Sequence, residues 1–364
     1  MNFSRLWTIA RLELLQRVRT VSWYVLLAIF GLLLLGVTLL AFVAYGGWGT
    51  GGAGVYSVVV YVTLLLALLV SPTLSGNSIN GDRDAATLAP VQVTLATTGE
   101  ILFGKFLAAW ITGLAFALVA APFLIVATFA GGVDPWSVIV SLVVLVVEIG
   151  VVAAIGVALS GILARPLFSV AVTYLVIAAL AVGSVIGFGL IGSAAGSEAV
   201  STSRYAAYDA MGNPECKDGS RDCYGDVDNM ICEDWQTSTY RVPRFDRVWW
   251  MLAANPFVIL ADATPTGYDS RGNPDDVFGW LKYSVRGAQL TPPLESVYDE
   301  CDPDYLYGNG STDYPRPQQV IAETVPSWFV GIGVQVLLAG LLLWWAWART
   351  RTPARTLPPG TRIA

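Results

Sequence analysis

The 364-residue sequence contains no histidine. This absence excludes Ser-His-Asp and Cys-His nucleophilic sites, imidazole metal ligands and the usual change of side-chain charge near neutral pH. Charged residues are also scarce, at 13% of the chain, whereas hydrophobic residues make up 55% and the mean hydropathy is +0.59. A soluble domain needs more polar surface than this. The composition therefore predicts a protein that uses a lipid bilayer as its apolar solvent.

Six apolar runs are long enough to cross the hydrocarbon core of a membrane, which takes about 20 helical residues. Five of the six contain no Asp, Glu, Lys or Arg, and the fourth contains only Glu148. We therefore predict an all-α polytopic membrane protein with six transmembrane helices, the first five within residues 21–192. The predicted spans are Val21–Tyr45, Val55–Leu74, Phe106–Phe129, Trp136–Leu163, Leu167–Ile191 and Ser327–Ala348.

The basic residues predict the orientation of these spans. Residues 1–20, the loops after the second and fourth spans, and the tail at 349–364 together carry 11 basic residues, whereas the two short loops between them carry none. The positive-inside rule then places both termini in the cytoplasm, with the protein in the cell membrane, such as a bacterial inner membrane. Residues 1–20 have the apolar spacing of an amphipathic helix on the inner membrane surface.

Residues 193–326 predict a mixed, loop-rich extracellular domain before the last span (327–348). This segment holds 21 of the 27 acidic residues and all four cysteines. On an oxidising side of the membrane the four cysteines predict two disulfides, and three pairings are possible. A zinc site is the rival interpretation, but the spacing of the cysteines does not match paired CxxC motifs. The cysteines are Cys216, Cys223, Cys232 and Cys301. The carboxylates in 222–229 favour a solvated acidic turn over a calcium loop.

Two apolar regions carry polar residues with open interpretations. Residues 248–263 are apolar but too short to span, and Asn255-Pro256 interrupts them. They form either a re-entrant or interfacial element or the core of the outer domain. Glu148 lies about 18 Å into the fourth span at 1.5 Å per residue, and it either serves a transport path or is a structural carboxylate.

The loop at 75–105 projects from the predicted inner face. Asp82-Arg83-Asp84 end the apolar run of the second span. Gly99-x4-Gly104-Lys105 matches part of a Walker A loop, but Phe106 stands where a magnesium-binding Ser or Thr is needed, and a membrane span follows. We therefore expect no nucleotide or metal cofactor on this chain.

This loop resembles that of the type-2 permease family of ATP-binding-cassette transporters. In that family an Ile-x-Gly-Glu-Arg-Glu-x-Gly-Thr-Leu pattern precedes a Gly-Lys pair at the next span. The matching residues here are Ile79, Gly81, Asp82, Arg83, Asp84, Thr87 and Leu88, with Gly104 and Lys105 further on. The inner-surface helix is similar at Arg11, Glu13, Leu14 and Leu15, and the apolar segment before the last span is similar at Asn255 and Pro256.

The resemblance implies a permease subunit of an ATP-driven exporter, which is not itself an enzyme. It implies a second permease subunit as a homo- or heterodimer partner and separate ATPase subunits that bind ATP and magnesium. The loop at 75–105 would be the coupling helix that contacts the ATPase. The alternatives are a non-transporting membrane scaffold or a receptor that binds a partner through the extracellular domain. A membrane enzyme is a third alternative, which the lack of histidine and of clustered carboxylates in the spans disfavours.

Overall fold

The computed structural model describes residues 2–45, 51–84, 97–220, 223, 226, 228–302 and 315–350. The chain divides into two compact units. The first, here called the helical unit, comprises Met1–Val185, Met251–Ser284 and Pro326–Ala364. The second, here called the sheet unit, comprises Ile186–Trp250 and Val285–Val325. The sequence placed residues 251–284 in one extracellular domain with their neighbours, whereas their contacts assign them to the helical unit.

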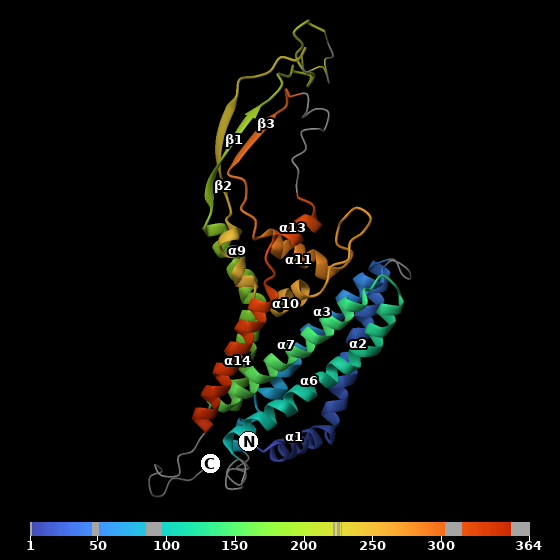
Figure 1. The fold of residues 1–364 in the computed structure, drawn as a ribbon, viewed down its shortest axis with the longest axis vertical. Coiled ribbons are helices and arrows are strands. Elements are labelled where there is room, and N and C mark those ends of the chain that lie inside the picture. The colour runs from blue at the N-terminus through green and yellow to red at the C-terminus, as the bar shows by residue number, and fades with distance from the viewer. Residues whose placement is uncertain are drawn as a thin grey trace. The chain divides into compact units, whose positions relative to one another are not determined.

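Six helices are long and apolar enough to span a membrane, as the sequence predicts. Helices α2, α3, α6 and α7 pack side by side (Figure 1), and α14 packs along α7. Their core contains stacked and edge-on aromatic rings, such as Phe116 between Trp23 and Phe30. The bounds are α2 Val21–Ala44, α3 Gly52–Ser75, α6 Thr98–Phe129, α7 Pro135–Ile162, α8 Pro166–Ala178, α9 Ser184–Ala194 and α14 Trp328–Thr350. Two further helices are α1, Phe3–Val18, and α4, Asn80–Asp84.

Helix α6 begins eight residues before the predicted third span. A capping box fixes its start, because Thr97 Oγ1 accepts from the Glu100 backbone N–H and Glu100 accepts from the Thr97 N–H. Hydropathy alone missed these first two turns because they contain Glu100 and Lys105 among their apolar residues, and both charged side chains are buried.

Asn255-Pro256 starts helix α10, Pro256–Ala263. The side-chain Oδ1 of Asn255 caps the helix by accepting from the Phe257 N–H at 2.9 Å, and the side-chain Nδ2 donates to the Ala181 carbonyl at 2.7 Å. Ala181 lies in a π-helical turn, Ala179–Gly183, between α8 and α9. Helix α10 packs against α7 and α14 and belongs to the helical unit, whereas residues 248–250 belong to the sheet unit. Its association with a membrane stays a prediction. Short 3₁₀ turns at Phe245–Arg247 and Trp249–Leu252 precede it, and α11 (Val277–Gly287) follows.

The sheet unit contains a three-stranded sheet in the order β2-β1-β3. Strand β1 (Ser197–Arg204) pairs antiparallel with β2 (Gln236–Val242) and parallel with β3 (Glu295–Asp299). Helix α13 (Pro317–Glu323) also belongs to this unit. Nearly all of β2 is exposed, so the sheet has little apolar cover.

Both disulfides expected from the sequence are present, and the pairing is Cys216–Cys223 and Cys232–Cys301. All four cysteines are therefore used, so none is free to bind zinc. With Ala206 and Met230 they form the small buried cluster of the sheet unit. Arg204 adds an ion pair to Asp299, with Nη2 and Oδ2 2.5 Å apart, and stacks over Trp235.

One short loop occurs twice, at residues 208–215 (YDAMGNPE) and 268–275 (YDSRGNPD). In each, the aspartate Oδ1 accepts from the backbone N–H groups two and four residues on. Each also has a β-bridge from its tyrosine to its proline. Gly212 and Gly272 have φ of 84° and 83°, which is why glycine stands at this position. The first copy lies in the sheet unit and the second in the helical unit.

Candidate functional site

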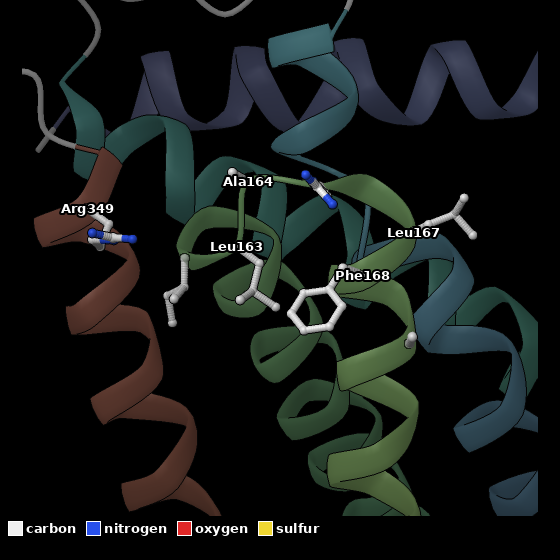
Figure 2. Close-up of a pocket in the computed structure, with 8 residues that line it drawn as sticks. Leu163, Ala164, Leu167, Phe168 and Arg349 are labelled. Carbon is white, nitrogen blue, oxygen red and sulfur yellow. The ribbon is translucent and has the colours of Figure 1, made fainter.

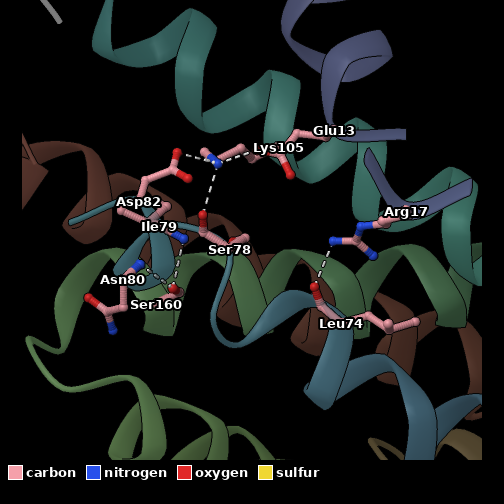
Figure 3. A network of polar contacts seen from close by, with 9 residues as sticks. All are labelled: Glu13, Arg17, Leu74, Ser78, Ile79, Asn80, Asp82, Lys105 and Ser160. Carbon is pink, nitrogen blue, oxygen red and sulfur yellow. Dashed lines mark hydrogen bonds and ion pairs between the residues drawn. The ribbon is translucent and has the colours of Figure 1, made fainter. Parts of the chain in front are cut away.

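Lys105 is the centre of a buried polar cluster at one end of the helical unit (Figure 3). Its side chain is only 3% exposed. The Nζ atom pairs with Glu13 of α1, lies 2.7 Å from Asp82 Oδ2 of α4, and donates to the Ser78 carbonyl at 2.8 Å. An ammonium group has three N–H donors, so these three acceptors satisfy it completely. One lysine on α6 thus joins α1 and α4.

Helix α1 is held against this end of the unit at further points. Arg17 Nη2 donates to the Leu74 carbonyl in the last turn of α3 at 2.7 Å, and the Asn2 N–H donates to Glu100 Oε1 at 2.5 Å. Burial lowers the pKa of Arg17 from its ordinary value, while the Glu13 carboxylate opposes that shift. A Cβ on Gly104 would lie 2.9 Å from the Ile9 side chain, so glycine is what permits α1 to pack this closely on α6.

The chain between α3 and α4 is anchored to α7 and α8 by two buried serines. Ser160 Oγ accepts from the backbone N–H groups of Ile79 and Asn80 at 3.0 and 3.1 Å. Ser169 Oγ donates to the Gly76 carbonyl at 2.5 Å and accepts from Asn80 Nδ2. These bonds satisfy backbone N–H and carbonyl groups that have no helical hydrogen-bond partner between α3 and α4. The segment from Leu74 to Arg83 therefore contacts α1, α6, α7 and α8 at once.

Arg83 is half-buried and points back toward the unit. Its guanidinium donates to the Gly161 carbonyl at 3.2 Å, to the Leu163 carbonyl at 3.5 Å and to Asn80 Oδ1 at 3.2 Å. Gly161 and Leu163 lie at the C-terminal end of α7, where carbonyls lack helical partners and the helix dipole favours a cation. Arg83 thus caps α7 and fixes α4 beside it.

Several residues of the predicted coupling loop therefore come together in space. Lys105 and Gly104 meet α1, and Asp82 pairs with Lys105. Ile79 is buried in the core, and Arg83 caps α7. Gly81 lies within α4, where an added Cβ would come no closer than 3.4 Å to Asn77. Asp84 ends α4. Thr87 and Leu88 lie outside the described residues, and their role stays a prediction.

Glu148 lies deep within the helical unit and is 1% exposed. Its hydrogen-bonding neighbour is Gln335 of α14, which also donates to the Ala254 carbonyl just before α10 at 3.0 Å. Among the described residues, Glu148 Oε1 has no hydrogen-bond partner. Gln335 thus connects the carboxyl of Glu148 with the chain just before α10. Whether Glu148 serves transport stays a prediction.

Sequence reasoning missed the residues that hold the site together, namely Ser160, Ser169, Asn80 and Gln335. Each is a polar residue inside an otherwise apolar span or at its end, and this isolation is the signal that could have identified them. Comparison with models of known protein families and with curated proteins finds no match for this chain.

Proposed function

We propose that this chain is the membrane-spanning subunit of an ATP-driven exporter of the ATP-binding-cassette type. It would form the translocation path with a second permease subunit and would dock separate ATPase subunits. The observation that carries the proposal is the Lys105 cluster, which joins the surface helix α1, the short helix α4 and the transmembrane helix α6. If a docked ATPase displaced α4, the movement would be transmitted to α1 and α6 through the side chains of the Lys105 cluster, which are already in contact.

The charge distribution supports this placement. The cluster lies at the end of the helical unit that carries the arginines of α1, Arg83 and Arg349, which the positive-inside rule assigns to the cytoplasm. Asp82 and Arg83 are engaged within the chain, so their role in coupling would be to position α4, and the surface that meets the ATPase would include α4.

The test is purification of the tagged chain from its native membranes in mild detergent. We expect an ATPase subunit, identified by mass spectrometry, to copurify, and we expect Arg83→Glu to reduce the ATP hydrolysis and transport of the purified complex. Arg19→Glu, an equal charge reversal at an exposed residue at the end of α1, is the control. Thermal melting of each variant separates loss of coupling from loss of folding.

Two results would contradict the proposal. One is a chain that purifies without any ATP-hydrolysing subunit, which would favour the scaffold or receptor alternative. The other is an Arg83→Glu complex that folds, hydrolyses ATP and transports like the unmodified one.

A further inference from the structure

A groove of about 750 Å³ opens between the end of α7, the start of α8 and the end of α14 (Figure 2). Its walls are mainly aliphatic and aromatic, and Figure 2 shows Leu163 and the Phe168 ring next to each other within it. Leu167 and Ala171 continue the same wall along α8. Because α8 is part of an apolar helix long enough to span a membrane, this wall would face the acyl chains of lipid.

Two arginines from different elements line this groove, Arg165 immediately before α8 and Arg349 in the last turn of α14. Both are exposed, and among the side chains that the structure describes no carboxylate forms an ion pair with either. Arg83 adds a third positive charge, close enough to Arg349 for the two to repel. The groove therefore combines apolar walls with two exposed arginines for which the described part of the chain supplies no ion-pair partner.

A second groove at α6 and α14 provides a comparison. It has a volume of about 610 Å³ and apolar residues such as Phe103 and Trp344, and no charged residue within the described part of the chain lines it. An apolar groove alone is what any lipid-facing surface offers. The pair of arginines is what distinguishes the groove at α8.

We propose that the groove at α8 binds an anionic phospholipid, with the phosphate between Arg165 and Arg349 and an acyl chain along Leu167, Phe168 and Ala171. Guanidinium groups match phosphate oxygens with paired hydrogen bonds, and basic pockets between transmembrane helices bind anionic lipid headgroups in this way. The negative charge of the phosphate would balance the positive charges of Arg165 and Arg349. A free phosphate ion would meet the same arginines but would leave the apolar wall unused.

The test is titration of the full chain, purified in detergent, with fluorescent phosphatidylglycerol and with fluorescent phosphatidylcholine. Taking about fivefold per basic residue, we expect a preference for phosphatidylglycerol of about 10-fold or more. The double variant Arg165→Gln/Arg349→Gln should lose most of this preference. Arg11→Gln/Arg19→Gln removes the same charge from exposed positions on and after α1 and should keep it.

A second arm distinguishes lipid from free phosphate. Ala171→Phe fills the apolar part of the groove and should weaken binding of phosphatidylglycerol, whereas Gly340→Leu, which fills the uncharged groove, should not. Inorganic phosphate in large excess should fail to displace the lipid. The proposal would be overturned if Arg165→Gln/Arg349→Gln kept the preference for phosphatidylglycerol, or if Arg11→Gln/Arg19→Gln lost it equally. It would also be overturned if inorganic phosphate displaced the lipid and Ala171→Phe had no effect on lipid binding. Thermal melting confirms that each variant folds.

Discussion

Lys105 and Asp276 show two ways in which a single buried charge is accommodated. Lys105 has an acceptor for each of its three donors. Asp276, which precedes α11, is 7% exposed, and its Oδ1 accepts from the Gly279 N–H at 2.7 Å. Burial raises the pKa of Asp276 to about 6, and the negative charge of Asp275 adds to this shift. The hydrogen bond from the Gly279 N–H and the positive charge of Lys282 oppose it. The charged form of Asp276 is therefore under-compensated in the folded chain.

This imbalance predicts a pH dependence of stability. Because the pKa of Asp276 is higher in the folded chain than in the unfolded chain, its contribution favours folding below about pH 4. That contribution is lost as the pH rises toward 6 and stays lost above it. Asp276→Asn keeps an oxygen for the Gly279 N–H, so we expect it to raise the melting temperature at pH 7, with a difference that shrinks toward pH 4.

Melting of the detergent-purified chain across pH 4–7 checks this expectation. Asp218→Asn is the matched control, because backbone hydrogen bonds from Ser220 lower the pKa of Asp218 and place its titration below this range. A melting temperature for Asp276→Asn that follows the unmodified chain at every pH would contradict the assignment.

Among the elements, the strands of the sheet unit depend most on covalent bonds. Six of the seven residues of β2 are exposed, and the buried cluster beside the sheet consists of Ala206, Met230 and the four cysteines. Apolar burial therefore contributes little to the stability of the sheet unit, and the two disulfides must contribute more of it. The two bonds close chain segments of very different length, with sequence separations of 69 and 7 residues.

Removing the two disulfides should therefore have unequal effects. Loop-closure entropy predicts that Cys232→Ala/Cys301→Ala lowers the stability of the sheet unit by about 4 kcal/mol, and Cys216→Ala/Cys223→Ala by about 2 kcal/mol. Hydrogen exchange of the backbone amides in β1 and β3 reports this opening free energy. Exchange from α3 and α7 in the same samples is the internal control. Equal protection of the strands in the two double variants would contradict the entropic account.

The sequence predicted the six long apolar helices well because each is a long apolar run, and hydropathy needs no knowledge of neighbouring elements. It missed the first two turns of α6, since Glu100 and Lys105 look like loop residues until α1 covers them. It also left the disulfide pairing open, because only the fold brings Cys232 and Cys301 together. For the site, it identified Asp82, Arg83 and Lys105 as a charged group. It could not identify Ser160 or Ser169 as their anchors, because a serine within an apolar run fits many environments.

For the whole molecule, the distribution of arginines predicts that α1 faces the cytoplasm and the sheet unit faces outward. All four native cysteines are in disulfides, so a single new cysteine can be labelled without background. We expect a membrane-impermeant maleimide to label Ser238→Cys on intact cells and to label Ser4→Cys only after permeabilisation. Both serines are exposed. The opposite labelling pattern would reverse the assigned orientation and move the Lys105 cluster away from any cytoplasmic ATPase.

The loop that occurs at 208–215 and again at 268–275 has a consequence for antibodies and selected binding proteins. Its tyrosine, aspartate, glycine, asparagine and proline recur at the same spacing, with the same aspartate-centred hydrogen bonds. A binder that recognises this shared backbone and these side chains would find two epitopes on every chain, one in each unit. A binder that reads the residues that differ, such as Ala210-Met211 against Ser270-Arg271, would be monovalent.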